Sequence, residues 1–184
     1  ATLSATGGTQ TGICRVTSYT SATVVNVAVL DEFGSLDATD EWSESYWSDR
    51  RGFPSSVAIY EGRLWWAGKD RIWGSVSDSY YNFDDTTEGD SGPINRSIGA
   101  GPVDRINWML PLQRLLLGAD GSIFSARSNS LDEPLTPTNF NLKDVSTQGA
   151  RNAPSAKVDK GGIFVQRSGT RVMGIEYDAD SYDY

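Results

Sequence analysis

The chain has 184 residues, no histidine, one cysteine, and 24 acidic against 16 basic side chains, which leaves a formal net charge of −8. Without histidine and with one cysteine, the sequence excludes Ser-His-Asp and Cys-His nucleophile systems, a classical zinc site and an internal disulfide. The negative charge disfavours general nucleic-acid binding, which needs clustered lysine and arginine. No apolar run approaches the roughly 18 residues that span a bilayer. We therefore expect no cofactor, no metal and no membrane association. The first residue is Ala rather than Met, which we interpret as a sign of a fragment or a processed product.

The N-terminal residues 1–41 are expected to form the end of a small β-domain and a linker. Residues 1–12 are small, polar and glycine-rich, as in a linker or a frayed edge. The continuous β-branched run at 23–30 is typical of a strand buried on both faces. Cys14 lies in a short apolar run and is expected to be a buried small hydrophobe. The aromatic stretch from Trp42 to Trp47 looks like a connector held down by its large side chains.

Residues 42–184 predict an all-β region of antiparallel meanders with two-residue turns. Three units, at about 53–100, 101–150 and 151–184, align on their middle strands. Those strands are Leu64-Trp65-Trp66, Leu115-Leu116-Leu117 and Ile163-Phe164-Val165. A meander that repeats about every 50 residues is typical of a propeller blade, because one meander cannot cover its own faces. We predict a partial, propeller-like array of about three blade-like units; the alternatives are a sandwich or hairpins that align by chance.

No set of residues predicts catalysis. Asp84, Asp85, Glu88 and Asp90 share one loop, but their spacing does not match a calcium-binding loop, so a solvated loop is expected. Carboxylate pairs suited to glycoside hydrolysis are always available among so many acids and carry little information. We predict no catalytic, cofactor-binding or metal-ligating residues. Trp65 and Trp66 are adjacent in a strand and should point to opposite faces.

Part of the sequence resembles a known family. Four segments carry the resemblance: Trp47-Ser48-Asp49-Arg50-Arg51-Gly52-Phe53-Pro54, Gly62-Arg63-Leu64-Trp65-Trp66-Ala67-Gly68, Ile72-Trp73-Gly74-Ser75 and Asn82-Phe83. They resemble the tail tubular protein B, or nozzle, family of short-tailed bacteriophages, densely at 47–83 and more loosely afterwards. Residues 1–35 resemble the end of the small β-domain of such proteins, which is similar to the first catalytic cysteine half-domain of ubiquitin-activating enzymes. The structural motif residues are Trp47, Arg51, Gly52, Phe53, Pro54, Gly62, Arg63, Leu64, Trp65, Trp66, Gly68 and Trp73.

The resemblance implies a non-enzymatic structural protein of the virion, assembled in the host bacterial cytoplasm. Its expected partners are other copies of itself in a ring, commonly of six in such proteins, and the adaptor or portal-proximal proteins of the tail. The genome would pass through the ring without specific binding, and an acidic wall suits that role because it repels phosphate. One alternative is a receptor- or glycan-binding tail module; glycan binding that depends on an exposed tryptophan would favour it. The other is a propeller-type glycan hydrolase; glycan turnover at two close carboxylates would favour it.

Two structural expectations can be checked directly. Phe53 precedes Pro54, which favours extended geometry, and should point into the body of the protein as a core anchor. Three meanders should also be too few to bury Trp65, Trp66, Trp73 and Trp108 together, which would leave an aromatic surface for self-association.

Overall fold

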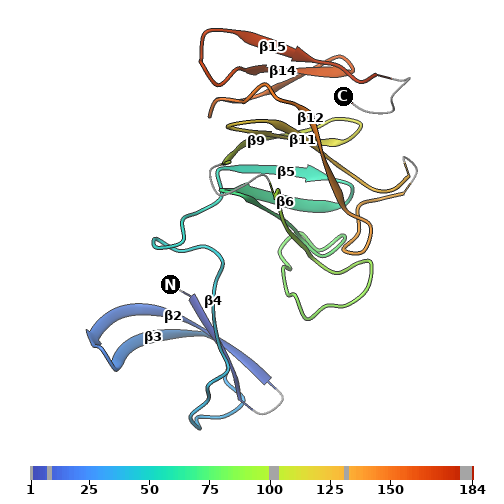
Figure 1. Ribbon diagram of the computed structural model, residues 1–184. Coiled ribbons are helices and arrows are strands. Elements are labelled where there is room, and N and C mark those ends of the chain that lie inside the picture. Colours follow the sequence, from blue (N-terminus) through green and yellow to red (C-terminus); the bar gives the residue numbers. More distant parts are fainter. Residues whose placement is uncertain (1, 8–9, 100–103, 131–132, 179–183) are drawn as a thin grey trace. The chain divides into compact units, whose positions relative to one another are not determined.

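The computed structural model describes residues 2–7, 10–99, 104–130, 133–178 and 184. The regular secondary structure of these residues consists of β-strands (Figure 1). All strand pairs are antiparallel, which confirms the all-β prediction. The chain divides into two compact units, Ala1–Phe53 and Pro54–Tyr184. This division into compact units falls after Phe53, whereas the sequence predicts a domain boundary between residues 41 and 42.

The first unit is a four-stranded sheet with the order β3-β2-β1-β4. Its strands are β1 (Thr2–Gly7), β2 (Gln10–Ser21), β3 (Val24–Asp31) and β4 (Trp42–Glu44). The linker prediction for residues 1–12 was wrong, because β1 pairs with β2 along its whole length. The connector prediction was also wrong for Trp42, which begins β4, pairs with Ala5 of β1 and remains 55% exposed.

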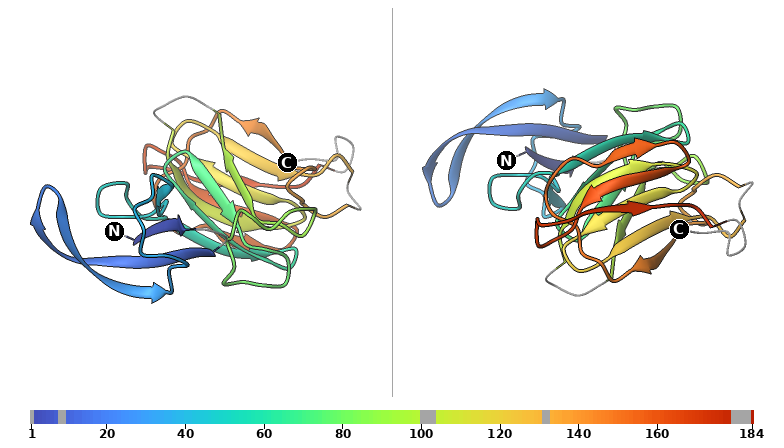
Figure 2. Two further views of the ribbon diagram at one scale, coloured as in Figure 1. Left: turned by 90° about the horizontal axis from the view of Figure 1, so that it is seen from below. Right: turned by 90° about the horizontal axis from the view of Figure 1, so that it is seen from above.

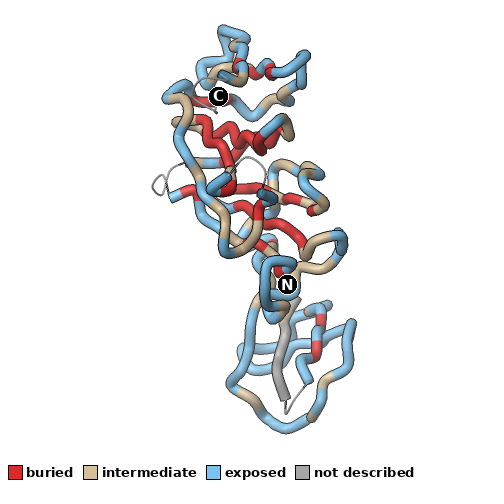
Figure 3. The backbone as a smooth tube through the Cα atoms, turned by 90° about the vertical axis from the view of Figure 1, so that its right-hand side faces the viewer, coloured by how far each residue is buried: buried red, intermediate tan, exposed pale blue. Residues whose placement is uncertain are grey.

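The β3 strand was predicted to be buried on both faces, and every residue in it is exposed (Figure 3). It pairs with β2 alone and forms the edge of the sheet. An edge hairpin has no second layer over either face, so its valines stay accessible however apolar they are. Cys14, on β2, is buried as predicted.

The second unit consists of three antiparallel sheets that follow one another in the chain (Figure 1). The first sheet contains β5 (Ser56–Tyr60), β6 (Arg63–Gly68), β7 (Arg71–Gly74) and β8 (Ile94–Ser97). The second contains β9 (Ile106–Pro111), β10 (Leu115–Ala119), β11 (Ile123–Arg127) and β12 (Asn141–Ser146). The third contains β13 (Ala156–Val158), β14 (Gly161–Val165) and β15 (Val172–Ile175). Each of the three predicted units contains one of these sheets.

Two-residue turns set the register of the meanders. Tyr60 pairs with Arg63, Gly68 with Arg71, and Val158 with Gly161. The first residue of each intervening turn has a positive φ: 48° at Glu61, 52° at Lys69 and 51° at Asp159. A first turn residue in the left-handed backbone conformation matches the twist of a tight hairpin. This explains why the sequence signals for these turns were reliable.

The second sheet is packed on both faces. Seen along the stack, the three sheets of the second unit lie over one another (Figure 2). Leu115 and Leu117 face the first sheet, where they belong to the same apolar cluster as Trp65 and Ile72. Leu116 belongs to a second cluster with Phe164 and Ile175 of the third sheet. Strand alternation therefore places successive leucines of β10 in two different cores, and all three are fully buried.

A tryptophan lies over a glycine in each of the first two sheets. Trp65 is the cross-strand partner of Gly74, and Trp108 is the partner of Gly118. A Cβ atom on Gly74 would lie 2.8 Å from the Trp65 ring, and one on Gly118 would lie 2.1 Å from the Trp108 ring. These glycines provide the space that the two buried indoles occupy.

Candidate functional site

The segment from Trp47 to Phe53 contains a tight turn in the first unit. The backbone N–H of Gly52 donates to the carbonyl oxygen of Ser48 at 2.6 Å, and the N–H of Ser48 donates back to Gly52 at 3.3 Å. Gly52 has a φ of +85°, a conformation that residues with a side chain rarely adopt. Glycine at this motif position is therefore explained by the backbone.

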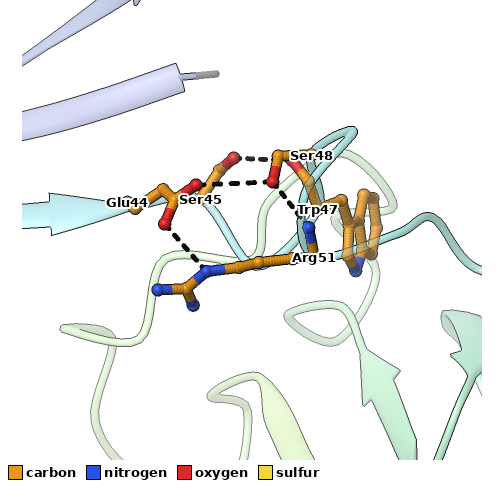
Figure 4. Close-up of polar contacts among 5 residues, drawn as sticks. All are labelled: Glu44, Ser45, Trp47, Ser48 and Arg51. Carbon is orange, nitrogen blue, oxygen red and sulfur yellow. Dashed lines mark hydrogen bonds and ion pairs between the residues drawn. The ribbon is translucent and has the colours of Figure 1, made fainter.

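Arg51 and Glu44 hold this turn to β4 (Figure 4). The Nε atom of Arg51 lies 2.9 Å from Oε2 of Glu44. The hydroxyl of Ser48 donates to Glu44 Oε1 at 3.3 Å and accepts a bond from the Arg51 backbone N–H at 3.0 Å. The carbonyl of half-buried Trp47 accepts a bond from the Ser45 hydroxyl at 2.8 Å. An accessible ion pair contributes at most about 1 kcal/mol, so this cluster shapes the turn more than it stabilises the fold.

Phe53 is 63% exposed, so the prediction that it anchors a core was wrong. It is the last residue of the first unit, and Pro54 begins the second. Extended geometry before proline orients the backbone, but it does not provide a pocket for the ring. Phe53 is a boundary residue and not a packing residue.

Replacing Phe53 with alanine is therefore expected to change the free energy of unfolding by less than about 1 kcal/mol, as for other exposed side chains. Denaturant unfolding followed by circular dichroism measures this. The matched control is Phe124→Ala, which removes a ring that is only 5% exposed in the core and should cost about 3–5 kcal/mol. A loss at Phe53 as large as that at Phe124 would contradict the observed exposure.

Arg63 is the most densely bonded residue of the motif. Its side chain is 2% exposed, and its guanidinium donates to main-chain oxygens only. The bonds to Ser75, Gly92 and Asp90 each measure 2.6 Å, and a longer one reaches Ser91 at 3.3 Å. Burial lowers the pKa of this guanidinium below its usual value, while nearby Asp78 and Glu61 act in the opposite direction. Arg63 thus fastens the loop between β7 and β8 to β6.

The remaining motif residues form β6 and its surroundings. Trp65 is fully buried, donates from Nε1 to the carbonyl of Tyr60 at 3.0 Å and stacks on Phe140 with ring centroids 6.0 Å apart. Trp66 is half-buried and is the cross-strand partner of Trp73. Because strand residues alternate, these two lie on the opposite face from Trp65, as the sequence predicts. Leu64 is half-buried on that same face, Gly62 has a φ of +69° in the first hairpin turn, and Gly68 ends β6 before the next turn.

We expected three meanders to be too few to bury all four tryptophans. Only one of the four is not buried. Trp65, Trp73 and Trp108 are each 9% exposed or less, and Trp66 is half-buried. The aromatic surface expected for self-association is therefore much smaller than the sequence suggested.

A cleft in the second sheet gathers basic side chains that sequence reasoning missed. It has a volume of about 480 Å³ and is lined by Arg114, Arg127, Ser128, Asn129, Asn141, Leu142 and Lys143, which we call the basic cleft. Arg127 on β11 and Asn141 on β12 are cross-strand partners, and Lys143 follows two residues later on the same face. Arg114, directly before β10, is only 6% exposed. No sequence motif links these positions; only the pairing of β11 with β12 and the start of β10 bring them together.

The acidic loop makes hydrogen bonds typical of a polar surface loop, both within the loop and to a residue distant in the chain. Asp84 accepts bonds from Thr86, and Asp90 accepts one from Thr138 at 2.8 Å. Within the described ranges, no group of three or more histidine, cysteine, aspartate or glutamate residues is close enough to hold a metal ion. The described part of the chain also contains no helix that is long and apolar enough to cross a membrane.

No protein-family model matches the chain, and no curated protein is similar to it at a significant level.

Proposed function

We propose that the protein is a structural component of a phage tail, in which residues 54–184 form part of a propeller-like wall of the conduit that delivers the genome. The resemblance of residues 47–83 to the nozzle family suggests this role. The observation that supports it most is the serial stacking of three meanders, each covering a face of the one before it.

The connections between sheets favour a propeller-like array over a two-layer sandwich. The first strands of the first two sheets are joined directly, because the Ser56 hydroxyl on β5 accepts a bond from the Met109 N–H on β9 at 3.0 Å. Ser55, just before β5, donates from its hydroxyl to the carbonyl of Ile106 at 2.6 Å. In a propeller the first strands of successive blades converge on the axis, whereas a sandwich opposes only two layers.

Side-chain bonds also fasten the array, within the second sheet's unit at residues 101–150 and between that unit and the one before it. Asn107 on β9 donates to Ala150 at 2.9 Å and to Asp120 at 2.7 Å, close to the point where the chain leaves the second sheet for the third. Glu61, in the first hairpin turn, accepts a bond from the Leu135 N–H at 2.7 Å. Such repeated links favour a rigid structural wall, and the proposal includes no catalytic step.

The net charge of −8 fits a wall that DNA must pass without adhering, because like charge removes the salt-dependent attraction of phosphates. Copies of the chain in a ring and the tail adaptor are the partners that this role requires. Location in the virion, after assembly in the host cytoplasm, is part of the same proposal.

Labelling of purified virions tests the proposal. Gold-tagged antibodies raised against the chain should decorate the tail of the phage that encodes it, and mass spectrometry of those virions should detect its peptides in a fixed ratio to the portal protein. Detection in infected cells together with absence from purified virions would contradict the structural role. Label on receptor-binding fibres alone would favour a receptor- or glycan-binding module instead.

A further inference from the structure

We propose that the basic cleft is a binding site for a small polar molecule that carries a dianionic oxyanion group, a phosphate monoester of a saccharide. The cleft lies in the second sheet and does not depend on any role of the chain in a phage tail. It is defined by one buried arginine, Arg114, together with Arg127 and Lys143.

The chemistry of the lining determines the ligand class. Guanidinium groups bind two oxygens of a phosphate or sulfate at once, and an ammonium group adds a mobile point charge. Each guanidinium carries five N–H donors, so it can hold a ligand oxygen in addition to a protein partner. Two arginines and one lysine on the same cleft complement a group with two negative charges better than a single carboxylate.

Three basic side chains in one cleft are notable because the chain as a whole is acidic. The chain has only 16 basic residues against 24 acidic ones, and three of the basic residues line one cleft. On the sheet face that carries Arg127 and Lys143, the cross-strand pairs Arg127–Asn141 and Ser125–Lys143 are basic or polar. Long-range attraction would not bring an anion to so acidic a protein, and binding must come from short-range contacts in the cleft.

The volume and the polar neighbours indicate that the oxyanion is attached to something larger. A volume of about 480 Å³ lies within the usual range of small-molecule sites and exceeds what one inorganic ion fills. Asn129 and Asn141 are linked by a 2.7 Å bond from Asn141 Nδ2 to Asn129 Oδ1. That bond orients both amides and leaves further donor and acceptor positions on each of them. Among the described residues of the lining, Leu142 is the sole large apolar side chain, which suits a hydroxylated ring more than an apolar one.

Isothermal titration of the full chain with glucose 6-phosphate, inorganic phosphate and glucose, at matched ionic strength, tests the proposal. We expect glucose 6-phosphate to bind more tightly than inorganic phosphate, and glucose to bind undetectably. Arg127→Gln and Lys143→Gln should each weaken binding of glucose 6-phosphate by about tenfold or more, which is the usual effect of losing one hydrogen bond to a charged group. Arg171→Gln and Lys157→Gln are the matched controls, since both residues are exposed outside the cleft, and they should leave binding unchanged.

Several results would overturn the proposal. Equal binding by the wild type and both cleft variants would place the ligand elsewhere, and binding of glucose as tight as that of its phosphate would show that the oxyanion is not recognised. Near-UV circular dichroism of each variant separates loss of binding from loss of folding, and Lys143→Gln, which changes an exposed side chain, keeps the test valid if Arg127→Gln does not fold.

Discussion

Arg63→Met should destabilise the second unit by about 3–5 kcal/mol, the range seen when one partner of a buried charged network is removed. Methionine keeps most of the volume of the arginine stem but has no donor. The carbonyl oxygens of Ser75, Asp90 and Gly92, each now bonded at 2.6 Å, would lose the guanidinium. Any of these carbonyl oxygens that remain buried would then have a hydrogen bond neither to the protein nor to water.

The effect should appear first in the loop that Arg63 holds. Hydrogen exchange of the backbone amides at 77–93 should accelerate at denaturant concentrations where β6 remains protected, because the loop is fastened to the sheet by these bonds. Denaturant unfolding of the full chain measures the free energy, and Arg71→Met is the matched control. Arg71 is an exposed arginine in the same sheet, bonded to Asn95, and its loss should change stability by less than about 0.5 kcal/mol. Equal effects at Arg63 and Arg71 would show that the carbonyl contacts contribute nothing.

Gly118→Ala is the second change with a large expected effect, and a destabilisation of about 1–3 kcal/mol or more is typical of overpacking in a closed core. The new Cβ would lie 2.1 Å from Cε2 of Trp108 and 2.3 Å from Cζ2. Trp108 is 3% exposed and packs against Phe164 with ring centroids 5.5 Å apart, so the indole cannot move away without disturbing the third sheet. Denaturant unfolding and the near-UV signal of the tryptophans measure the change.

Gly174→Ala provides the matched control. It is also a glycine in a strand, it has no positive φ, and a Cβ there would meet nothing within 4 Å. The alanine should be neutral or slightly stabilising, because it reduces the freedom of the unfolded chain without a clash. A Gly118→Ala protein as stable as the Gly174→Ala protein would show that Trp108 has room to shift. A double substitution with Trp108→Leu should be far less destabilising than the sum of the two single changes if the clash is local.

The local elements of the second unit could be predicted from sequence because their signals are local. Strand β6 places the apolar residues Trp65 and Ala67 on the face that packs in the core, and the Glu61-Gly62 turn specifies its own hairpin. The fourth strands, β8 and β12, were missed because they lie in polar stretches where residues such as Asn95 and Lys143 pair in a sheet while facing solvent. Edge strands need apolar residues on one face at most, so their pattern does not stand out.

The sequence by itself determined the all-β class, the three meanders, the buried cysteine and the opposite orientations of Trp65 and Trp66, because each follows from alternation or turn chemistry within a few residues. Only the tertiary structure decided that Phe53 and β3 are exposed, because burial depends on whether another layer covers a residue. It also decided that the Arg63 side chain ends among the carbonyls of a loop almost thirty residues away and that Arg114, Arg127 and Lys143 share one cleft. Such contacts join positions that are distant in the chain, and no local pattern of residues specifies them.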